Sequence, residues 1–215
     1  VSGLRVSGKL NTADQTTLKG FNSLQLIDLA ETNLTTIASQ QFSGKSTLKK
    51  VVLPSKTTTI GSNAFYNCYA LEEIVVPATL QTIGEYAFYN CKALTAFYFP
   101  EGLTRIGYDA FYCNNDSGYY DDNGNYVQTG GGSLKEISLP GTLVDYMGNA
   151  IGSYAFNGQT QLTKITLAEG ITTLPESVFR NCTSLTDLTL PSTLTYIGSY
   201  AFGYCSALKT LDLPE

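Results

Sequence analysis

Apolar residues recur along the chain in a repeating unit of about 23 residues. Each unit opens with L-x-x-I-x-L, and the alternation of apolar and polar positions is typical of a short, half-buried strand. The openings begin at Leu24, Leu48, Leu71, Leu94, Leu134, Leu162, Leu185 and Leu208. Successive openings are 23 or 24 residues apart, except for spacings of 40 after Leu94 and 28 after Leu134. The pattern therefore predicts eight repeats, two of which carry insertions.

The remainder of each repeat predicts further elements. A proline follows most of the predicted strands and should end them, because it lacks an N–H group. Leu80 and Ile83, three residues apart, predict a second short extended piece, after which we expect Gly84 to let the chain turn back. The next segment, EYAFYNC in one copy, predicts a helical or 3-10 turn that points its phenylalanine inward. The equivalent phenylalanines should form a spine: Phe42, Phe65, Phe88, Phe111, Phe156, Phe179 and Phe202.

The period also predicts the domain organisation. A single repeat cannot cover its own apolar face, whereas stacked repeats share one continuous core. We therefore expect a solenoid over residues 24–215, preceded by an N-terminal cap over 1–23 that consists of a strand (4–10) and a short helix (13–21). Asn123 and Gly124 between two tyrosine-containing stretches indicate a type I′ turn, which predicts a β-hairpin insertion over 113–133.

The repeat resembles a known family. The segment CKALTAFYFPEGLTRIGYDAF, residues 91–111, matches the unit C-x-x-L-x-x-I-x-L-P-x-x-L-x-x-I-G-x-x-A-F of BspA-like leucine-rich repeats almost position for position. The resemblance covers residues 24–215 and implies a curved right-handed stack, with a parallel β-sheet on the concave face and short strands or 3-10 turns on the convex face. Repeat one departs with Asn33 and no proline, and repeat six with Ala168 and LPESVF.

The resemblance also implies a secreted or cell-surface protein that binds host or matrix proteins, or other bacteria. The sequence begins with Val1 rather than methionine, which we interpret as a processed chain whose export signal has been removed. No apolar run approaches the roughly 18 to 20 residues of a membrane-spanning helix.

Composition narrows the chemistry. The chain contains no histidine, which removes Ser-His-Asp and Cys-His activation and the commonest metal ligand. Its net charge of -5 is scattered, so no basic stripe predicts binding to nucleic acid. Asp121, Asn123 and Asn125 alternate as at the start of a calcium loop, but the later glycine and bidentate glutamate are missing. We therefore expect a protein that is not an enzyme and needs neither cofactor nor metal.

Four cysteines share one position, three residues after the spine phenylalanine: Cys68, Cys91, Cys182 and Cys205. We interpret them as a column of small buried side chains, because free cysteine is usually core. A disulfide between neighbours would require favourable side-chain directions, and a thiolate nucleophile would lack a histidine to activate it. Cys113 stands one residue early, so we expect it to be the most exposed cysteine.

Two surfaces are candidate contact sites. The x positions of L-x-x-I-x-L should point out of the concave face; they include Lys50, Val52, Glu73, Val75 and Tyr98. Among them, the two valines and the tyrosine should lie side by side as an apolar stripe, and such patches often mark binding sites. The second surface is the hairpin, whose tyrosines offer large amphipathic contact area; they are Tyr119, Tyr120 and Tyr126.

These surfaces predict a protein-binding module that uses the concave face and the hairpin. One alternative is a structural spacer within a larger surface protein. Another is a carbohydrate-binding module with tyrosines as stacking platforms, although the chain has no tryptophan. The last repeat, LKTLDLPE, has no polar cap, so we expect either further repeats or end-to-end pairing with a second copy.

Overall fold

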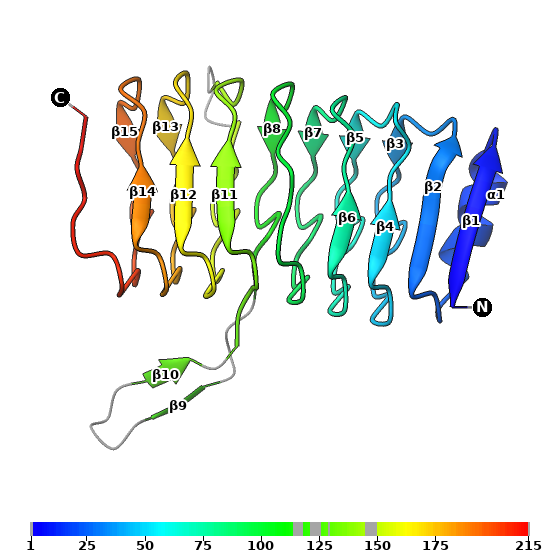
Figure 1. The fold of residues 1–215 in the computed structure, drawn as a ribbon, viewed down its shortest axis with the longest axis horizontal. Coiled ribbons are helices and arrows are strands. Elements are labelled where there is room, and N and C mark those ends of the chain that lie inside the picture. Colours follow the sequence, from blue (N-terminus) through cyan, green and yellow to red (C-terminus); the bar gives the residue numbers. More distant parts are fainter. Residues whose placement is uncertain (1, 114–117, 121–125, 129, 145–149, 215) are drawn as a thin grey trace.

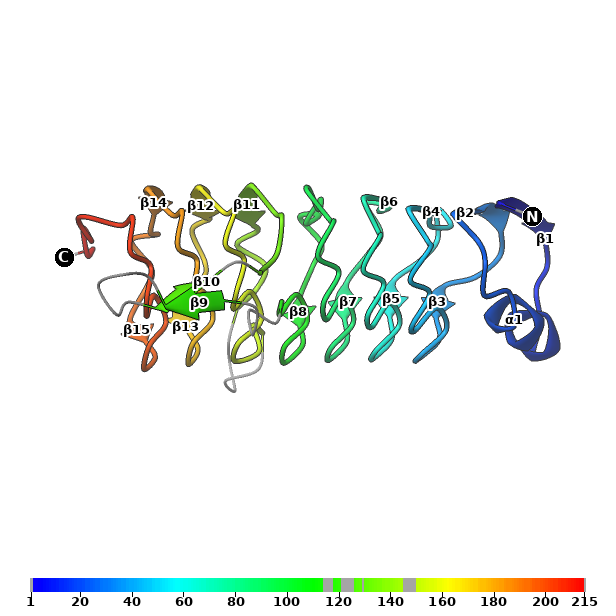
Figure 2. The same cartoon turned by 90° about the horizontal axis from the view of Figure 1, so that it is seen from below.

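The computed structural model describes residues 2–113, 118–120, 126–128, 130–144 and 150–214. These residues form a leucine-rich repeat solenoid of about eight turns, stacked along one axis (Figure 1). Each regular turn contributes one strand to the concave sheet and a two-residue strand to the opposite side (Figure 2). The fold predicted from the 23-residue period is therefore confirmed.

The concave sheet is parallel and consists of two pieces, β1-β2-β4-β6 and β11-β12-β14. Its strands are β1 (Gly3–Gly8), β2 (Leu26–Thr32), β4 (Lys50–Val52), β6 (Glu73–Val75), β11 (Glu136–Leu139), β12 (Lys164–Leu167) and β14 (Asp187–Thr189). Equivalent residues pair in register, for example Val51 with Ile74. Six of the eight predicted repeat strands form. The prediction is wrong for the openings at 94–99 and 208–213, which have no strand.

The opposite ladder is also parallel and also divided. One part contains β3 (Thr36–Ile37), β5 (Thr59–Ile60), β7 (Thr82–Ile83) and β8 (Arg105–Ile106), and the other contains β13 (Thr173–Leu174) and β15 (Tyr196–Ile197). In regular repeats the residue after isoleucine donates its N–H to the preceding repeat, as Gly152 does to the Ile106 carbonyl at 2.7 Å. Pro175 occupies that position in repeat six and has no N–H, so it cannot donate the equivalent hydrogen bond to repeat five.

The spine phenylalanines stack as predicted. Their ring centroids lie 5.0 to 5.7 Å apart, with interplanar angles of 9° to 20°. All except Phe202 are at most 1% exposed. Between them the chain forms hydrogen-bonded turns, in which the Cys91 N–H donates to the Phe88 carbonyl at 3.1 Å. Tyr86 and Asn90, with φ of 56° and 58°, bound this turn. The spine is the centre of the shared core.

The glycine of each Ile-Gly pair has a role that differs from the predicted one. Gly84 has no positive φ; instead, a Cβ at this position would lie 2.5 Å from the backbone nitrogen of Ser62. A Cβ at Gly107 would likewise lie 2.5 Å from the backbone nitrogen of Glu85. Glycine is therefore required here because the backbones of successive repeats approach closely.

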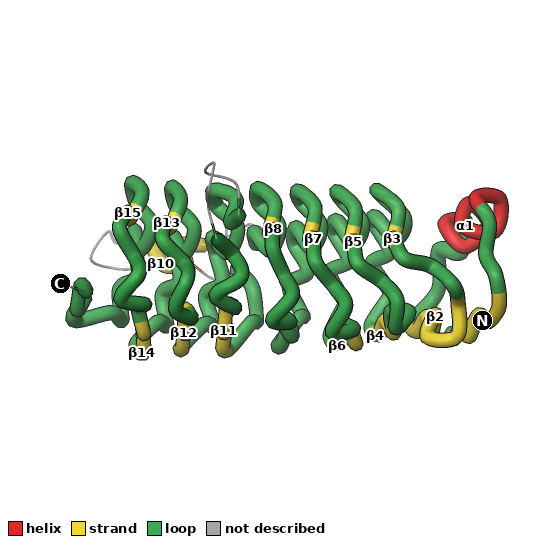
Figure 3. Tube along the Cα trace, turned by 90° about the horizontal axis from the view of Figure 1, so that it is seen from above, coloured by secondary structure: helices red, strands yellow, loops and turns green. Residues whose placement is uncertain are grey.

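The first repeat is covered by β1 and by helix α1 (Thr12–Lys19), which lies at the end of the stack (Figure 3). Asn11 caps the helix by accepting hydrogen bonds from the N–H groups of Ala13 and Asp14. The buried Lys45 joins the helix to the solenoid, since its Nζ donates to the carbonyls of Lys19 and Phe21 at 2.8 and 2.7 Å. These elements occupy the segment that the sequence assigned to a cap.

The insertion contains an antiparallel pair, β9 (Gly118–Tyr120) and β10 (Tyr126–Gln128), which projects away from the stack (Figure 1). Tyr126 pairs with Tyr120, and Val127 pairs with Tyr119. The predicted turn at Asn123 and Gly124 lies outside the described residues. The calcium-like triplet at 121, 123 and 125 lies outside them as well.

The cysteine column is buried, as predicted, and it also forms hydrogen bonds. The Sγ atoms of Cys68, Cys91 and Cys205 donate to the spine phenylalanine carbonyl of the preceding repeat at 3.1, 3.2 and 3.2 Å. Burial raises the pKa of the Cys68 thiol to about 12, which opposes a thiolate role. In repeat five, Gln159 occupies the equivalent position and donates to the Phe111 carbonyl at 2.5 Å. This column therefore ties each repeat to the one before it.

The prediction that Cys113 is exposed is wrong, since the residue is only 1% exposed. Its N–H donates to the Asn157 carbonyl at 3.0 Å, and its Sγ accepts a hydrogen bond from Gln159 Nε2 at 3.5 Å. Gly132, near the end of the insertion, passes over the same glutamine, because a Cβ at this position would clash with Gln159 Oε1. Gln159 thus closes the core where the insertion leaves the solenoid.

Candidate functional site

Repeat four interrupts the concave sheet. Residues 96–99 lie between β6 and β11 but form no strand. Within the described part of the chain, no backbone hydrogen bond joins 96–99 to either strand. Just before these residues, the Lys135 N–H donates to the Thr95 carbonyl at 3.3 Å. In the regular pair β4–β6, by contrast, bonds such as Leu53 N–H to Val75 carbonyl continue along the strand. Among the described residues, backbone groups on the facing edges of both neighbouring strands therefore have no partner in 96–99.

Two bulky side chains account for the interruption. Phe97 and Phe99 occupy consecutive inward positions and are 8% and 6% exposed, whereas other repeats place aliphatic residues there. Phe97 packs edge-on against Phe111 with centroids 4.9 Å apart, and Phe99 packs against Phe156 at 5.7 Å. Two additional rings against an already filled spine force the segment out of ladder register, as overpacking does in other cores.

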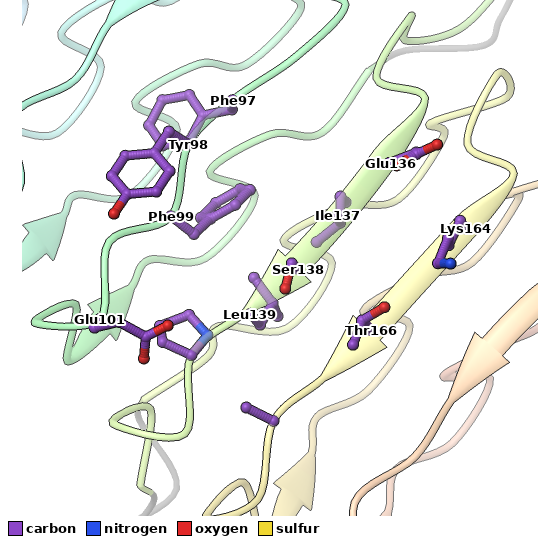
Figure 4. Close-up of a pocket in the computed structure, with 12 residues that line it drawn as sticks. Phe97, Tyr98, Phe99, Glu101, Glu136, Ile137, Ser138, Leu139, Lys164 and Thr166 are labelled. Carbon is purple, nitrogen blue, oxygen red and sulfur yellow. The ribbon is translucent and has the colours of Figure 1, made fainter.

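Tyr98 lies between these rings in sequence and is 57% exposed. It lines two hollows in the concave face. The first, of about 570 Å³, lies toward β4 and β6 and includes Lys49, Lys50, Glu72 and Glu73. The second, of about 300 Å³, lies between the repeat-four segment and β11, with β12 beyond it (Figure 4). Residues that line the second hollow include Glu101, Glu136, Ser138, Lys164 and Thr166.

The two hollows differ in charge. In the first, Lys49 pairs with Glu72 at 3.3 Å and Lys50 pairs with Glu73 at 2.7 Å, so its charges are balanced. In the second, the Lys164 ammonium pairs with Asp187, which is not among the lining residues, at 3.2 Å.

Glu101 and Glu136 form no ion pair with any described residue. Within the described part of the chain, the second hollow therefore presents two carboxylates that lie outside any ion pair.

The structure places the predicted concave residues as follows. Val52 and Val75 are register neighbours, and Val75 is 43% exposed. Lys50 and Glu73 lie beside them and form an ion pair. Tyr98 lies next to this group but across the break in the ladder, so the three apolar residues do not share a continuous sheet.

The hairpin residues lie apart from the hollows in the sequence and in the fold. Tyr119, Tyr120 and Tyr126 belong to β9 and β10. Glu101, by contrast, was not singled out from the sequence, although it follows Pro100 directly. The signal for the whole site was the FYF segment, which places two phenylalanines at consecutive inward positions.

A second surface, formed by tyrosines, was not predicted from the sequence. Six tyrosines form a connected cluster: Tyr66, Tyr86, Tyr89, Tyr108, Tyr112 and Tyr154. Tyr66, Tyr89 and Tyr112 stack with centroids 4.9 Å apart at each step. Because stacked rings cover one another's faces, these three tyrosines present mostly ring edges and are poorly suited to stacking against a sugar.

Asp109 is nine-tenths buried among these tyrosines, with 9% of its surface exposed. Its Oδ1 atom has no hydrogen-bond partner within the described part of the chain. Burial raises the pKa of this carboxyl to about 7. Burial first, and then the Asp109 charge, raise the pKa of Tyr86 and Tyr108. The carboxyl is thus held near its neutral form by its surroundings.

This shift predicts a pH dependence of stability. The folded-state pKa of Asp109, about 7, exceeds its ordinary value of 3.8, so the folded state binds the proton more tightly than the unfolded chain. The contribution of Asp109 to the free energy of unfolding is therefore fully present below about pH 4 and is lost as the pH rises toward 7. Asp109→Asn, which cannot ionise, should reduce the loss of stability between about pH 5 and pH 8 by ~1–2 kcal/mol.

Urea denaturation of the wild type and Asp109→Asn at both pH values measures the effect of Asp109. Asp212→Asn, at an exposed position, serves as the matched control and should leave the pH dependence unchanged. Identical pH profiles for Asp109→Asn and the wild type would contradict the assignment of a proton to this carboxyl.

Among the described residues, no group of three or more His, Cys, Asp or Glu side chains could hold a metal ion. Within the same residues, α1 and the rest of the chain provide no helix with the length and apolar character needed to cross a bilayer.

Comparison with known proteins agrees with the fold. The family described as BspA type leucine rich repeat region matches residues 9–119 and 124–215, with 6 copies. No curated protein matches the chain.

Two solved structures resemble the chain. A leucine-rich repeat protein from Bacteroides ovatus aligns with a TM-score of 0.69 and 28% identity, over 84% of this chain and 41% of that one. The leucine-rich repeat protein of T. pallidum aligns with a TM-score of 0.66 and 25% identity, over 96% of this chain and 83% of that one. The chain thus spans less than half the length of the Bacteroides protein.

Proposed function

Because the chain belongs to the BspA-type leucine-rich repeat family, we propose that it is a non-enzymatic, cell-surface or secreted module that binds another protein through its concave face around Tyr98. One observation carries the proposal: the concave sheet is interrupted at repeat four, which leaves an exposed tyrosine between two hollows. Tyrosine in such a place offers a large contact area at low cost in conformational entropy.

The surrounding residues support the same surface. Val75 and Val52 extend the apolar area toward β4, and Lys50 and Glu73 border it with polar groups. An apolar centre with a polar border is typical of protein interfaces. The hairpin strands, with Tyr119, Tyr120 and Tyr126, are a second contact in this proposal. Adhesion to host or matrix proteins, or to other bacteria, is the biological role that we propose for both.

Tyr98→Ala is expected to weaken binding of a captured partner about tenfold or more, since exposed aromatic anchors often contribute that much to an interface. The partner is first captured from extracellular matrix and serum with the wild-type chain as bait, and its affinity is then measured by biolayer interferometry. Tyr196→Ala is the matched control, because Tyr196 is 59% exposed but lies in β15, on the opposite ladder.

The outcomes separate the proposed function from its alternatives. Equal affinities for the wild type and Tyr98→Ala would overturn the site. Failure to capture any protein would favour a structural spacer, and end-to-end pairing would appear as a dimer in light scattering. A glycan array tests the carbohydrate alternative, for which the stacked tyrosine faces offer no support.

A further inference from the structure

We infer that the second hollow binds an extended segment of the partner protein that carries two basic side chains four residues apart. This inference rests on the proposed function, because it names the chemistry of the partner at the same concave site. It follows from the charges in the hollow, the spacing of its carboxylates and the unpaired backbone of β11.

The charge of the hollow selects a basic partner. Glu101 and Glu136 line it without an ion pair among the described residues, and Lys164 already pairs with Asp187. A lysine or arginine side chain that reaches either carboxylate would gain an ion pair without displacing an existing one. An acidic segment would instead meet repulsion from both.

Tyr98 adds to this preference. Its ring is 57% exposed and forms one wall of the hollow, opposite the strand that carries Ser138 (Figure 4). A guanidinium or ammonium group over a tyrosine face is stabilised by the ring quadrupole. The hydroxyl groups of Ser138 and Thr166 lie on the same lining and can accept hydrogen bonds from the bound group.

The repeat register sets the spacing of the basic residues. Glu136 occupies the position equivalent to Ala96, because the repeats open at Leu134 and Leu94. Glu101 follows five residues after that position, so the two carboxylates mark opposite ends of the hollow, as Figure 4 shows. Five extended residues span about 16 Å. In an extended peptide, side chains at i and i+4 point the same way about 13 Å apart, and long basic side chains cover the remainder.

The backbone favours an extended partner. In a regular pair of repeats, the N–H groups at the positions of Glu136 and Ser138 donate to the preceding strand, as Glu73 donates to the Lys49 carbonyl at 3.0 Å. In repeat five, the Lys135 N–H donates to the Thr95 carbonyl at 3.3 Å, but among the described residues neither the Glu136 nor the Ser138 N–H donates to residues 95–99. An extended chain in the hollow can accept these hydrogen bonds, as in other cases of strand addition to an open edge.

The test uses three fluorescein-labelled, acetylated peptide amides and the full chain, with binding followed by fluorescence anisotropy. Arg-Ser-Val-Ser-Arg carries the predicted spacing, Ser-Arg-Val-Arg-Ser has its basic residues two apart, and Glu-Ser-Val-Ser-Glu reverses the charge. We expect the first to bind most tightly, the second about threefold more weakly and the third not at all up to about 1 mM. Binding of the first should weaken as the salt concentration rises.

The variants separate this inference from the proposed function. Glu101→Gln with Glu136→Gln should weaken binding of the first peptide about tenfold. The control, Glu31→Gln with Asp212→Asn, changes the net charge equally at exposed positions in other repeats and should have no effect. Equal binding of the first and third peptides, no binding of the first up to about 1 mM, or equal effects of the two double variants would overturn the inference. After any of these three results, a Tyr98→Ala variant that still binds the captured partner more weakly would leave the protein-binding function standing, and only the basic-partner inference would be wrong.

Discussion

Phe111→Ala is expected to lower the free energy of unfolding by about 4 kcal/mol, within the range for removing a fully buried aromatic ring. Phe111 is 1% exposed and stacks on Phe88 and Phe156, with centroids 5.0 and 5.2 Å away. It also meets Phe97 and Phe99 edge-on at 4.9 and 5.5 Å. Its loss would therefore leave a cavity that adjoins four other rings, at the point where the insertion already interrupts the stack.

Urea denaturation followed by circular dichroism and by tyrosine fluorescence measures this change with two probes. Phe202→Ala is the matched control, because Phe202 contacts one spine ring, Phe179, at 5.7 Å and is only partly buried. We expect the control to cost about 2 kcal/mol or less. Equal losses for the two variants would show that stability is evenly distributed along the spine and that repeat four is not its centre.

The period of the sequence predicts the solenoid and the spine because each repeats over many copies. Phenylalanine at seven equivalent positions favours an arrangement in which the rings stack inside a shared core, and the structure buries all of them except Phe202, which is partly buried. The break at repeat four could not be predicted in the same way, because the repeat pattern describes what all copies share and not how one copy differs. Phe97 and Phe99 satisfy the apolar pattern as well as isoleucine or leucine would, but their side chains are larger. An apolar/polar pattern contains no information about volume, so the candidate site around Tyr98 was located only in part.

The cysteine position shows a second limit. Cysteine in four repeats suggested a small apolar filler, so Lys45 and Gln159 at the same position had no explanation. All of them donate a hydrogen bond to a carbonyl of the preceding segment. The common property is donation rather than size, and it appears only when the carbonyl partner is known. The predicted exposure of Cys113 was wrong for a similar reason. The residue that contacts its Sγ atom is Gln159, which lies 46 residues later in the chain.

The sequence analysis assigned the glycine of the Ile-Gly pair to a turn of the chain. In the structure, glycine is required there because the backbones of successive repeats lie close together. The distinction has a measurable consequence. Gly84→Ala would place a Cβ 2.5, 2.7 and 2.9 Å from three backbone atoms of Gly61 and Ser62. Backbone atoms cannot move aside as the end of a flexible side chain can, so successive repeats would have to separate along the ladder.

We expect Gly84→Ala to lower the free energy of unfolding by about 3 kcal/mol, a typical cost of overpacking a well-packed interior. Gly102→Ala is the matched control in the neighbouring repeat: a Cβ there would meet only the Ala78 carbonyl oxygen, at 3.9 Å, and its φ is not positive. It should leave stability unchanged or raise it by up to ~1 kcal/mol, since alanine restricts the unfolded chain. Thermal and urea denaturation of both variants provide the comparison. If Gly84 served only as a flexible turn residue without positive φ, Gly84→Ala would behave like Gly102→Ala, and the close approach of the repeats would not determine the residue at this position.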